Sequence, residues 1–139
     1  MAAMLKLAAV DSRDVVYDLG SGDGRIPIAA ARQFGARGVG LEIHPERIAE
    51  ARRNALQAGV AGRAEFRLGD IFEADLREAT VVTMFLLADL NRKLRPKLQA
   101  ELRPGTRVLS YCFDMGDWKP ARTIDAGGCK IHLWTIPRR

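Results

Sequence analysis

Apolar and polar positions follow one another along the chain in blocks that predict a regular succession of strands and helices. Short runs rich in Val, Leu and Ile, bounded by turn residues, predict strands over 15–19, 37–42, 64–68, 80–86 and 107–112. Apolar residues at helical spacing predict helices over 25–34 and 45–58, and an apolar N-terminal segment predicts a short helix over 1–10. Strands that alternate with helices favour a parallel sheet covered on both faces.

A proline disturbs the helical pattern between the fourth and fifth predicted strands. Leucines recur there at close to helical spacing, and Pro96 stands among them. A proline inside a helix removes a hydrogen bond and clashes with the preceding turn. We therefore expect a kink, or two short helices that meet near Arg95. Beyond the fifth strand, residues 121–125 and 130–136 flank Gly127-Gly128, which predicts a hairpin.

The most informative motif is a glycine-rich turn that joins the first strand to the first long helix. Gly20, Gly22 and Gly24 allow backbone dihedrals closed to other residues and let the backbone contact a ligand directly. A dinucleotide site has the spacing G-x-G-x-x-G, whereas the third glycine here comes one residue early. Asp18 and Asp23 flank the turn and suit a cationic ligand such as S-adenosylmethionine, which carries a sulfonium and an ammonium.

Together with two further strand ends, this loop resembles that of the class I, seven-strand S-adenosylmethionine-dependent methyltransferases. Glu42 ends the second strand where that family binds the ribose hydroxyls, and Asp70 follows the third strand where it binds the adenine amino group. Taken singly, either acid could instead cap a helix or lie on the surface. The resemblance implies an α/β, Rossmann-like, doubly wound and mostly parallel seven-stranded sheet, with helices on both faces and a C-terminal antiparallel hairpin. It implies these cofactor-binding residues: Asp18, Gly20, Ser21, Gly22, Asp23, Gly24, Glu42, Ile43, Asp70 and Ile71.

The methyl acceptor is expected beside the residues that follow the fourth and fifth strands. Methyl transfer from a sulfonium requires mainly alignment and the exclusion of water. Residues 83–87 lack the Asn/Asp-Pro-Pro-Tyr found in many methyltransferases that act on planar amides and adenine amino groups. An apolar, aromatic rim with a few acids fits a lysine side chain. The predicted catalytic residues are Phe85, Phe113, Asp114 and Trp118. The alternative for Asp114 is a turn with Gly116.

The chain resembles a narrower group as well, the small prokaryotic relatives of the mitochondrial lysine methyltransferase of the ATP synthase c subunit. The residues that carry this resemblance are 18–26, 40–42, 94–98 with 101–102, and Phe113 with Trp118. Relatives have an upstream aromatic-x-Pro-Thr segment that helps close the cofactor pocket. Because this chain starts after that point, we expect either a more open cofactor site or a natural start further upstream.

Composition leaves the nature of the acceptor open. The 139 residues carry a net charge of +5, with a pI near 9.7, so acidic proteins, nucleic acid or an anionic membrane are conceivable partners. The densest basic group is Arg92, Lys93, Arg95, Lys97, Arg103 and Arg107. Solvated helix faces explain it as well, since aromatic residues are not interleaved. We favour a protein lysine; the alternatives are an RNA or small-molecule acceptor, or a module that binds the cofactor without catalysis.

The remaining expectations concern domain count, cysteines, metals and location. Residues 1–139 are predicted to form a single domain, without a transmembrane run or a signal peptide, and a cytoplasmic location follows by default. Cys112 and Cys129 are too few for a disulfide framework, so reduced, half-buried thiols are expected. Neither cysteine has the neighbours of a metal site, and no metal is predicted.

Overall fold

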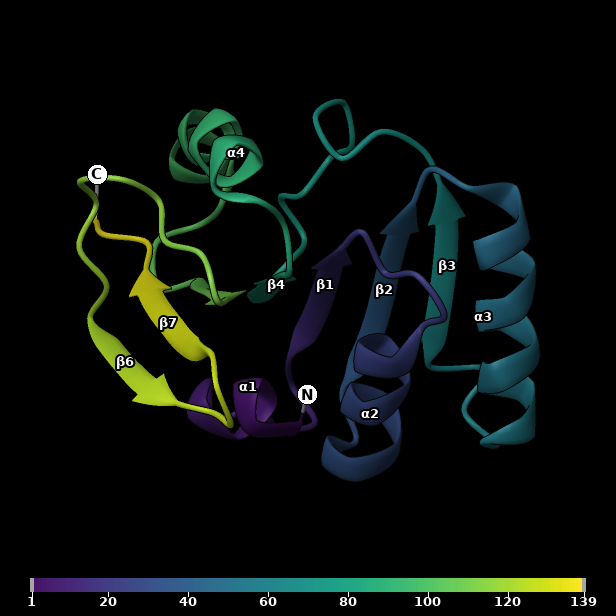
Figure 1. The fold of residues 1–139 in the computed structure, drawn as a ribbon. Coiled ribbons are helices and arrows are strands. Elements are labelled where there is room, and N and C mark those ends of the chain that lie inside the picture. Colours follow the sequence, from purple (N-terminus) through teal and green to yellow (C-terminus); the bar gives the residue numbers. More distant parts are fainter. Residues whose placement is uncertain (1, 139) are drawn as a thin grey trace.

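The computed structural model describes residues 2–138, which form a seven-stranded sheet flanked by helices (Figure 1). The strands are β1 (Val15–Leu19), β2 (Arg37–Glu42), β3 (Ala64–Leu68), β4 (Val81–Met84), β5 (Arg107–Tyr111), β6 (Arg122–Asp125) and β7 (Lys130–Thr135). The helices are α1 (Ala2–Leu7), α2 (Arg25–Phe34), α3 (Pro45–Gln57) and α4 (Ala88–Glu101). The predicted alternation of strands and helices is confirmed.

The order of strands in the sheet is β3-β2-β1-β4-β5-β7-β6. Strands β1 to β5 pair in parallel, and β7 pairs antiparallel with both β5 and β6. This is the predicted Rossmann-like sheet with its C-terminal hairpin. The order reverses between β1 and β4, because the chain first builds outward from β1 through β2 to β3 and then returns to the other side of β1. Open parallel sheets bind ligands at such a switch point.

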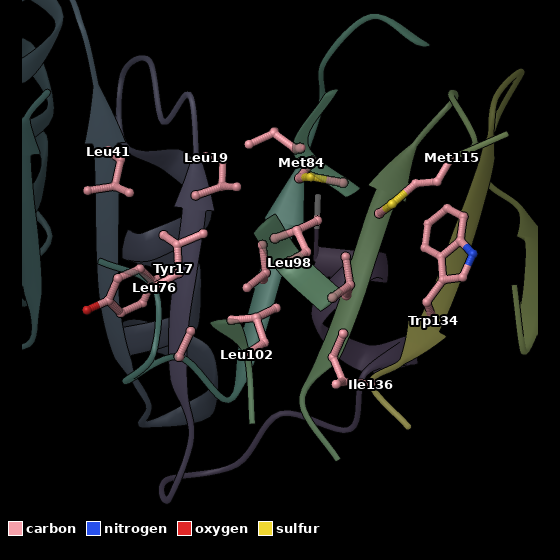
Figure 2. Packing of buried hydrophobic residues seen from close by; sticks show 14 of the residues in the cluster. Tyr17, Leu19, Leu41, Leu76, Met84, Leu98, Leu102, Met115, Trp134 and Ile136 are labelled. Carbon is pink, nitrogen blue, oxygen red and sulfur yellow. The ribbon is translucent and has the colours of Figure 1, made fainter. Parts of the chain in front are cut away.

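Helices cover both faces of the sheet, with α1 and α2 on one face and α4 on the other (Figure 1). On the α4 face, Leu94, Leu98 and Leu102 pack onto side chains of the central strands, among them Tyr17 and Met84. Figure 2 shows this layer, which Trp134 and Ile136 extend toward the C-terminus. On the opposite face, apolar residues of α1 and α2 pack onto β1, β4, β5 and β7. Burial on both faces explains why the central strands are almost uniformly apolar.

Of the two alternatives expected around Pro96, that of two short helices is wrong, because α4 is continuous from Ala88 to Glu101, while the kink stays a prediction. Pro96 lies on the exposed side of the helix, whereas Leu94 and Leu98 are buried against the sheet. The buried leucines lie on both sides of the proline in sequence, so packing against the sheet holds the helix together despite the missing backbone hydrogen bond. Strand β4 and helix α1 are shorter than predicted.

The expectation of reduced thiols is also wrong, since Cys112 and Cys129 form a disulfide bond with a Cα–Cα distance of 4.9 Å. Antiparallel pairing of Tyr111 with Ile131 places the next residues of β5 beside the turn that precedes β7. The Cys112 N–H donates to the Lys130 carbonyl at 2.8 Å, which extends the ladder to the cysteine itself. Counting cysteines could not reveal this proximity, because it depends on the register of two strands far apart in sequence.

Candidate functional site

A cavity of about 260 Å³ lies at the switch point, where the loop after β1 faces the end of β4. Its lining consists of Asp18, Gly20, Ser21, Gly22, Asp23, Arg25, Ile26, Arg47 and Phe85. Five of the predicted cofactor-binding residues and one of the predicted catalytic residues therefore share one hollow. The cavity has an acidic and glycine-rich side from β1 and an aromatic side from β4.

Backbone hydrogen bonds fix the glycine loop against the end of β2. The N–H groups of Gly20 and Ser21 both donate to the Leu41 carbonyl, at 2.8 and 3.0 Å. Gly20 and Gly22 have φ values of 84° and 57°, in the region that other residues rarely adopt. Among the described residues, a Cβ added at Gly22 would meet no atom within 4 Å, so this glycine keeps backbone open toward the cavity.

Gly24 is not among the residues that line the cavity, and it packs closely against neighbouring elements. A Cβ built at Gly24 would lie 2.7 Å from the Phe66 ring and 2.9 Å from the Ala51 side chain. The third glycine therefore allows the start of α2 to pack closely onto α3 and β3. Its predicted contact with the cofactor stays a prediction.

Asp18 lies on β1 and is buried. Burial raises the pKa of its carboxyl to about 7, and the nearby carboxylates of Glu42 and Asp23 contribute to that rise. The Thr83 hydroxyl donates to Asp18 Oδ1 at 2.9 Å and favours the ionised form. Parallel pairing sets Asp18 opposite Thr83 on β4. A cation that enters the cavity would stabilise the ionised form of Asp18 and would compensate for the hydration that the carboxylate loses on burial.

Asp23 does not present a free carboxylate to the cavity, because it pairs with Arg25. The Arg25 guanidinium donates to Asp23 Oδ2 at 2.9 Å and keeps the pKa of that carboxyl below its usual range. The Asn54 side chain on α3 donates to the Asp23 carbonyl at 3.0 Å and holds the loop from the other side. The two flanking acids thus differ, since Asp18 is buried without a cationic partner and Asp23 has one.

Glu42 ends β2 with both carboxylate oxygens bound to backbone N–H groups. Oε1 accepts from Gly22 at 2.8 Å, and Oε2 accepts from Ile43 at 3.0 Å and from His44 at 3.1 Å. The side chain therefore fixes the glycine loop and the entry to α3 at the same time. A carboxylate has about four acceptor positions, so these three bonds leave room for a hydroxyl donor from a ligand.

The predicted adenine-binding residues lie beside a second cavity, of about 310 Å³, that is lined in part by Leu41 and Asp70. Asp70 is exposed, and its Oδ1 accepts the Phe72 N–H at 2.9 Å. Ile71 packs partly buried against the α4-side core, whereas Ile43 is 61% exposed. The strand order places β2, and hence Glu42, between β1 and β3. Contacts of Ile43, Asp70 and Ile71 with a bound cofactor stay predictions.

The predicted catalytic residues Phe85 and Trp118 lie in different surroundings. Phe85 lines the first cavity and is 54% exposed. Trp118 instead packs inward, with its ring centroid 5.7 Å from that of Trp134 and the Arg95 guanidinium 5.9 Å above it. Phe113 lies in the loop that precedes Trp118 and does not line the first cavity. Catalytic roles for these two aromatic residues stay predictions.

Asp114 forms a turn with Gly116, which was the alternative to a catalytic role for this residue. Its Oδ1 accepts the Gly116 N–H at 3.1 Å, and its carbonyl accepts from the Asn91 side chain at 3.1 Å. The same Asn91 amide donates to the Phe113 carbonyl and to Ser110 Oγ. Asn91 therefore anchors the loop after β5 onto α4. An effect of the Asp114 carboxylate on an incoming amine stays a prediction.

Sequence reasoning missed three residues that line the first cavity, Arg25, Ile26 and Arg47, and one beside it, Thr83. Arg25 and Arg47 line the cavity from the first turns of α2 and α3, and Thr83 bonds to Asp18. The position of Arg25 directly after the glycine loop was an available signal. The contribution of Arg47 depends on how α3 packs beside the loop, and that of Thr83 depends on the register between β1 and β4, neither of which the sequence pattern reveals.

The first cavity fits the polar end of S-adenosylmethionine. Ser21 lines the cavity, but its buried Oγ packs against β2, 2.5 Å from where a Cβ at Gly40 would lie, so the loop and β2 contact each other closely here. Buried Asp18 supplies an anion for an ammonium or sulfonium, while Arg25, which pairs with Asp23, and Arg47, which pairs with Glu50, add positive charge beside the position of a carboxylate. Phe85 supplies an apolar wall. A zwitterionic ligand with a cationic sulfur thus finds complementary groups on each side.

Comparison with known proteins places the chain among methyltransferases. A model of the ANTKMT methyltransferase domain family matches residues 18–122. A protein-lysine N-methyltransferase of Saccharolobus islandicus is 53% identical over 122 residues, which cover 87% of this chain and 76% of that protein. The adenine nucleotide translocase lysine N-methyltransferase of mouse is 36% identical over 87% of this chain, which spans only 53% of the mouse protein.

A solved structure matches over nearly the whole chain. It is the crystal structure of an RNA methyltransferase from Salinibacter ruber in complex with S-adenosyl-L-homocysteine, with 59% identity and a TM-score of 0.98. The match covers 99% of this chain and 90% of that one. The names of these similar proteins therefore differ in the kind of acceptor.

The raised pKa of Asp18 predicts that stability falls as the pH rises. The pKa is about 7 in the folded state against 3.8 for an ordinary aspartate, so between these limits the unfolded state releases a proton that the folded state retains. This carboxyl should lower the free energy of unfolding by up to about 1.4 kcal/mol per pH unit over that window, with no further loss above it.

Urea denaturation from pH 4.5 to 8 of the wild type and of Asp18→Asn measures this effect. The variant keeps an oxygen for the Thr83 hydroxyl but cannot ionise, so its stability relative to the wild type should increase with pH up to about 7. Parallel curves for the two proteins would mean that Asp18 is ionised throughout the window.

The three hydrogen bonds to Glu42 predict that Glu42→Gln weakens cofactor binding by about tenfold or more, as loss of charge-assisted hydrogen bonds implies. An amide has one acceptor oxygen, so its NH₂ group must face at least one of the N–H donors that the carboxylate satisfies. Titration calorimetry with S-adenosylhomocysteine measures the change. Glu46→Gln, at an exposed acid in the first turn of α3, is the matched control and should bind as the wild type does. Equal affinity of both variants would contradict the role of Glu42.

Proposed function

This chain belongs to the ANTKMT methyltransferase domain family, and from that membership we propose that it transfers the methyl group of S-adenosylmethionine to the side-chain amine of a protein lysine. The chain is an S-adenosylmethionine-dependent methyltransferase. The lysine acceptor is supported by the names of two relatives and by the apolar character of the acceptor side of the cavity.

The observation that carries the proposal is the segment directly after β4. Phe85 lines the cavity with 54% exposure, and Leu87 is 65% exposed two residues later. Methylenes of a lysine side chain need an apolar surface of this kind, whereas a base or a planar amide needs hydrogen-bonding groups at its edges. The first residues past the switch point are therefore suited to an aliphatic chain that carries an amine.

The residues of the cavity would bind the cofactor, exclude water and align the acceptor. When bound, S-adenosylmethionine supplies an electrophilic methyl group on a sulfonium. Asp18, Arg25 and the glycine loop would hold the polar end of the cofactor, and Phe85 would exclude water beside the approach path. A lysine acceptor would have to release its ammonium proton to solvent, and the cavity walls would hold the neutral amine in line with the methyl group. Alignment by the cavity walls then contributes more than acid–base catalysis.

An RNA acceptor is the second candidate, and the name of the Salinibacter ruber protein favours it. The charge distribution supports it less well. In the basic group predicted as a possible nucleic-acid surface, Arg92 pairs with Asp89, Arg95 with Asp117, and Lys97 with Glu101. Arg107 pairs with Asp14. These four of the group's six cations have carboxylate partners, which lowers the net positive charge that a phosphate backbone would meet.

A cytoplasmic location and an acidic protein partner remain part of the proposal. None of the helices between residues 2 and 138 has the length and hydropathy of a membrane span. The net charge of +5 favours acidic partners.

A labelling experiment tests the nature of the acceptor. The purified protein, incubated with methyl-labelled S-adenosylmethionine and a cell lysate, should transfer label to material that protease removes and nuclease leaves intact. Acid hydrolysis of that material should release labelled methyl-lysine. Label that nuclease removes would instead establish the RNA alternative.

Gly22→Val is the control for transfer by this site. The new side chain would extend into the cavity and occupy a backbone conformation with φ of 57° that valine disfavours. This variant should transfer no label while its circular dichroism spectrum stays that of a folded protein. Transfer by the variant at the wild-type rate would show that the label enters through another enzyme or another site.

A further inference from the structure

We propose that the Cys112–Cys129 disulfide bond positions the acceptor side of the cavity through Tyr111 and Phe85, so that reduction by a dithiol lowers methyl transfer. This inference rests on the proposed function, because it concerns the wall along which the acceptor approaches. It assigns Tyr111 and the two cysteines a positioning role outside the cavity itself.

The first link joins the cavity to Tyr111. In the parallel pairing of β4 with β5, Met84 lies opposite Ser110. Phe85, directly after β4, and Tyr111, the last residue of β5, therefore follow this pair side by side. Their rings meet edge to face, with centroids 5.0 Å apart and an interplanar angle of 88°. Phe85 is more than half exposed, so its position depends on the few groups that it contacts, and the Tyr111 ring is one of them.

The second link joins Tyr111 to the turn between β6 and β7. The Tyr111 hydroxyl donates to the Ala126 carbonyl at 3.4 Å, and the Ala126 N–H donates to the Cys129 carbonyl at 2.8 Å. Tyr111 also packs beside Ile124 and Ala126 on the sheet face opposite α4. Its ring thus lies between Phe85 and the turn that contains one of the two cysteines.

The third link is the disulfide bond. Cys112, directly after Tyr111, has a φ of 76°, which a residue other than glycine adopts at a cost in free energy. Its N–H bond to Lys130 and its bond to Cys129 hold that conformation. The opposite turn contains Gly127 and Gly128, both with positive φ, and glycines give such a turn many alternative conformations once a covalent restraint is removed. Reduction therefore frees both the backbone beside Tyr111 and the turn that contacts its hydroxyl.

The chemical step is ordinary thiol–disulfide exchange. One thiolate of a dithiol attacks a sulfur of the pair and forms a mixed disulfide, and the second thiol of the reagent displaces the enzyme thiol. The enzyme gains two electrons and two protons as two cysteine thiols, and the dithiol becomes a disulfide. Both cysteines are partly exposed, so a small dithiol can reach them.

The test compares the oxidised enzyme with the enzyme reduced by dithiothreitol, using two readouts. The first is the rate of methyl transfer to poly-L-lysine, together with the affinity for S-adenosylhomocysteine. The second is hydrogen exchange, which needs no acceptor. Reduction should lower the transfer rate at least fivefold, change cofactor affinity less than twofold and speed exchange in residues 110–113 and 84–86. Exchange in residues 18–24 and 42–44 should stay unchanged.

Variants separate positioning from loss of the fold. Tyr111→Leu should transfer methyl groups slowly in both redox states, with a thermal melting curve that shows a folded protein. Tyr111→Phe keeps the ring against Phe85 but loses the hydroxyl bond to Ala126, so its rate should lie between those of Tyr111→Leu and the wild type and respond less to dithiothreitol. A Cys112→Ser, Cys129→Ser double variant should behave as the reduced enzyme does and ignore dithiothreitol. Lys130→Ala, which trims an exposed side chain beside Cys129, should respond as the wild type does.

Two results would overturn the positioning role of the disulfide bond. Equal exchange in residues 84–86 before and after reduction would overturn it, whether or not poly-L-lysine is methylated. Loss of transfer in step with loss of cofactor affinity or of the folded state would overturn it as well. Absence of transfer to poly-L-lysine in both redox states would count against the lysine acceptor, and the exchange result would then decide the positioning role alone.

Discussion

The hydrogen bonds that the Glu42 carboxylate accepts from Gly22, Ile43 and His44 tie together the parts from which the site is built. Gly22 belongs to the loop after β1, and the other two lead from β2 into α3. One buried side chain thus sets the distance between the glycine loop and the start of α3, and with it the position of Arg47 on the cavity wall. The bonds also leave an acceptor position for a ligand, so the same carboxylate can organise the empty loop and contact what binds there.

Asp18 adds an electrostatic constraint to this geometric one. Burial raises its pKa to about 7, while the neighbouring Asp23 carboxylate is balanced by Arg25. Near neutral pH the Asp18 carboxyl is therefore only partly ionised, and a bound cation would shift it toward the carboxylate. A cofactor with an ammonium and a sulfonium supplies such a cation, and Arg25 and Arg47 are placed to balance its carboxylate. The site favours a zwitterion without a large net charge of its own.

Periodicity and glycine spacing predicted most of the fold because they report local constraints. The central strands are buried on both faces and read as apolar runs, and the glycine loop has a spacing that only a few backbone shapes allow. The features that the sequence pattern did not predict depend on side-chain packing and on the register between strands. Helix α4 continues through Pro96 because buried leucines on both sides hold it, and Thr83 meets Asp18 because of the pairing of β1 with β4. Aromatic character alone likewise did not separate Phe85, in the cavity, from Trp118, stacked beside Trp134.

The account depends above all on how the cofactor lies across the carboxyl ends of β1, β2 and β4. A crystal structure of the complex with S-adenosylhomocysteine measures this directly. We expect the amino group of the ligand within hydrogen-bond distance of Asp18, a ribose hydroxyl on the free acceptor position of Glu42, and Phe85 beside the sulfur. A ligand bound elsewhere, or one that displaces the Glu42 carboxylate from Gly22, would contradict the account.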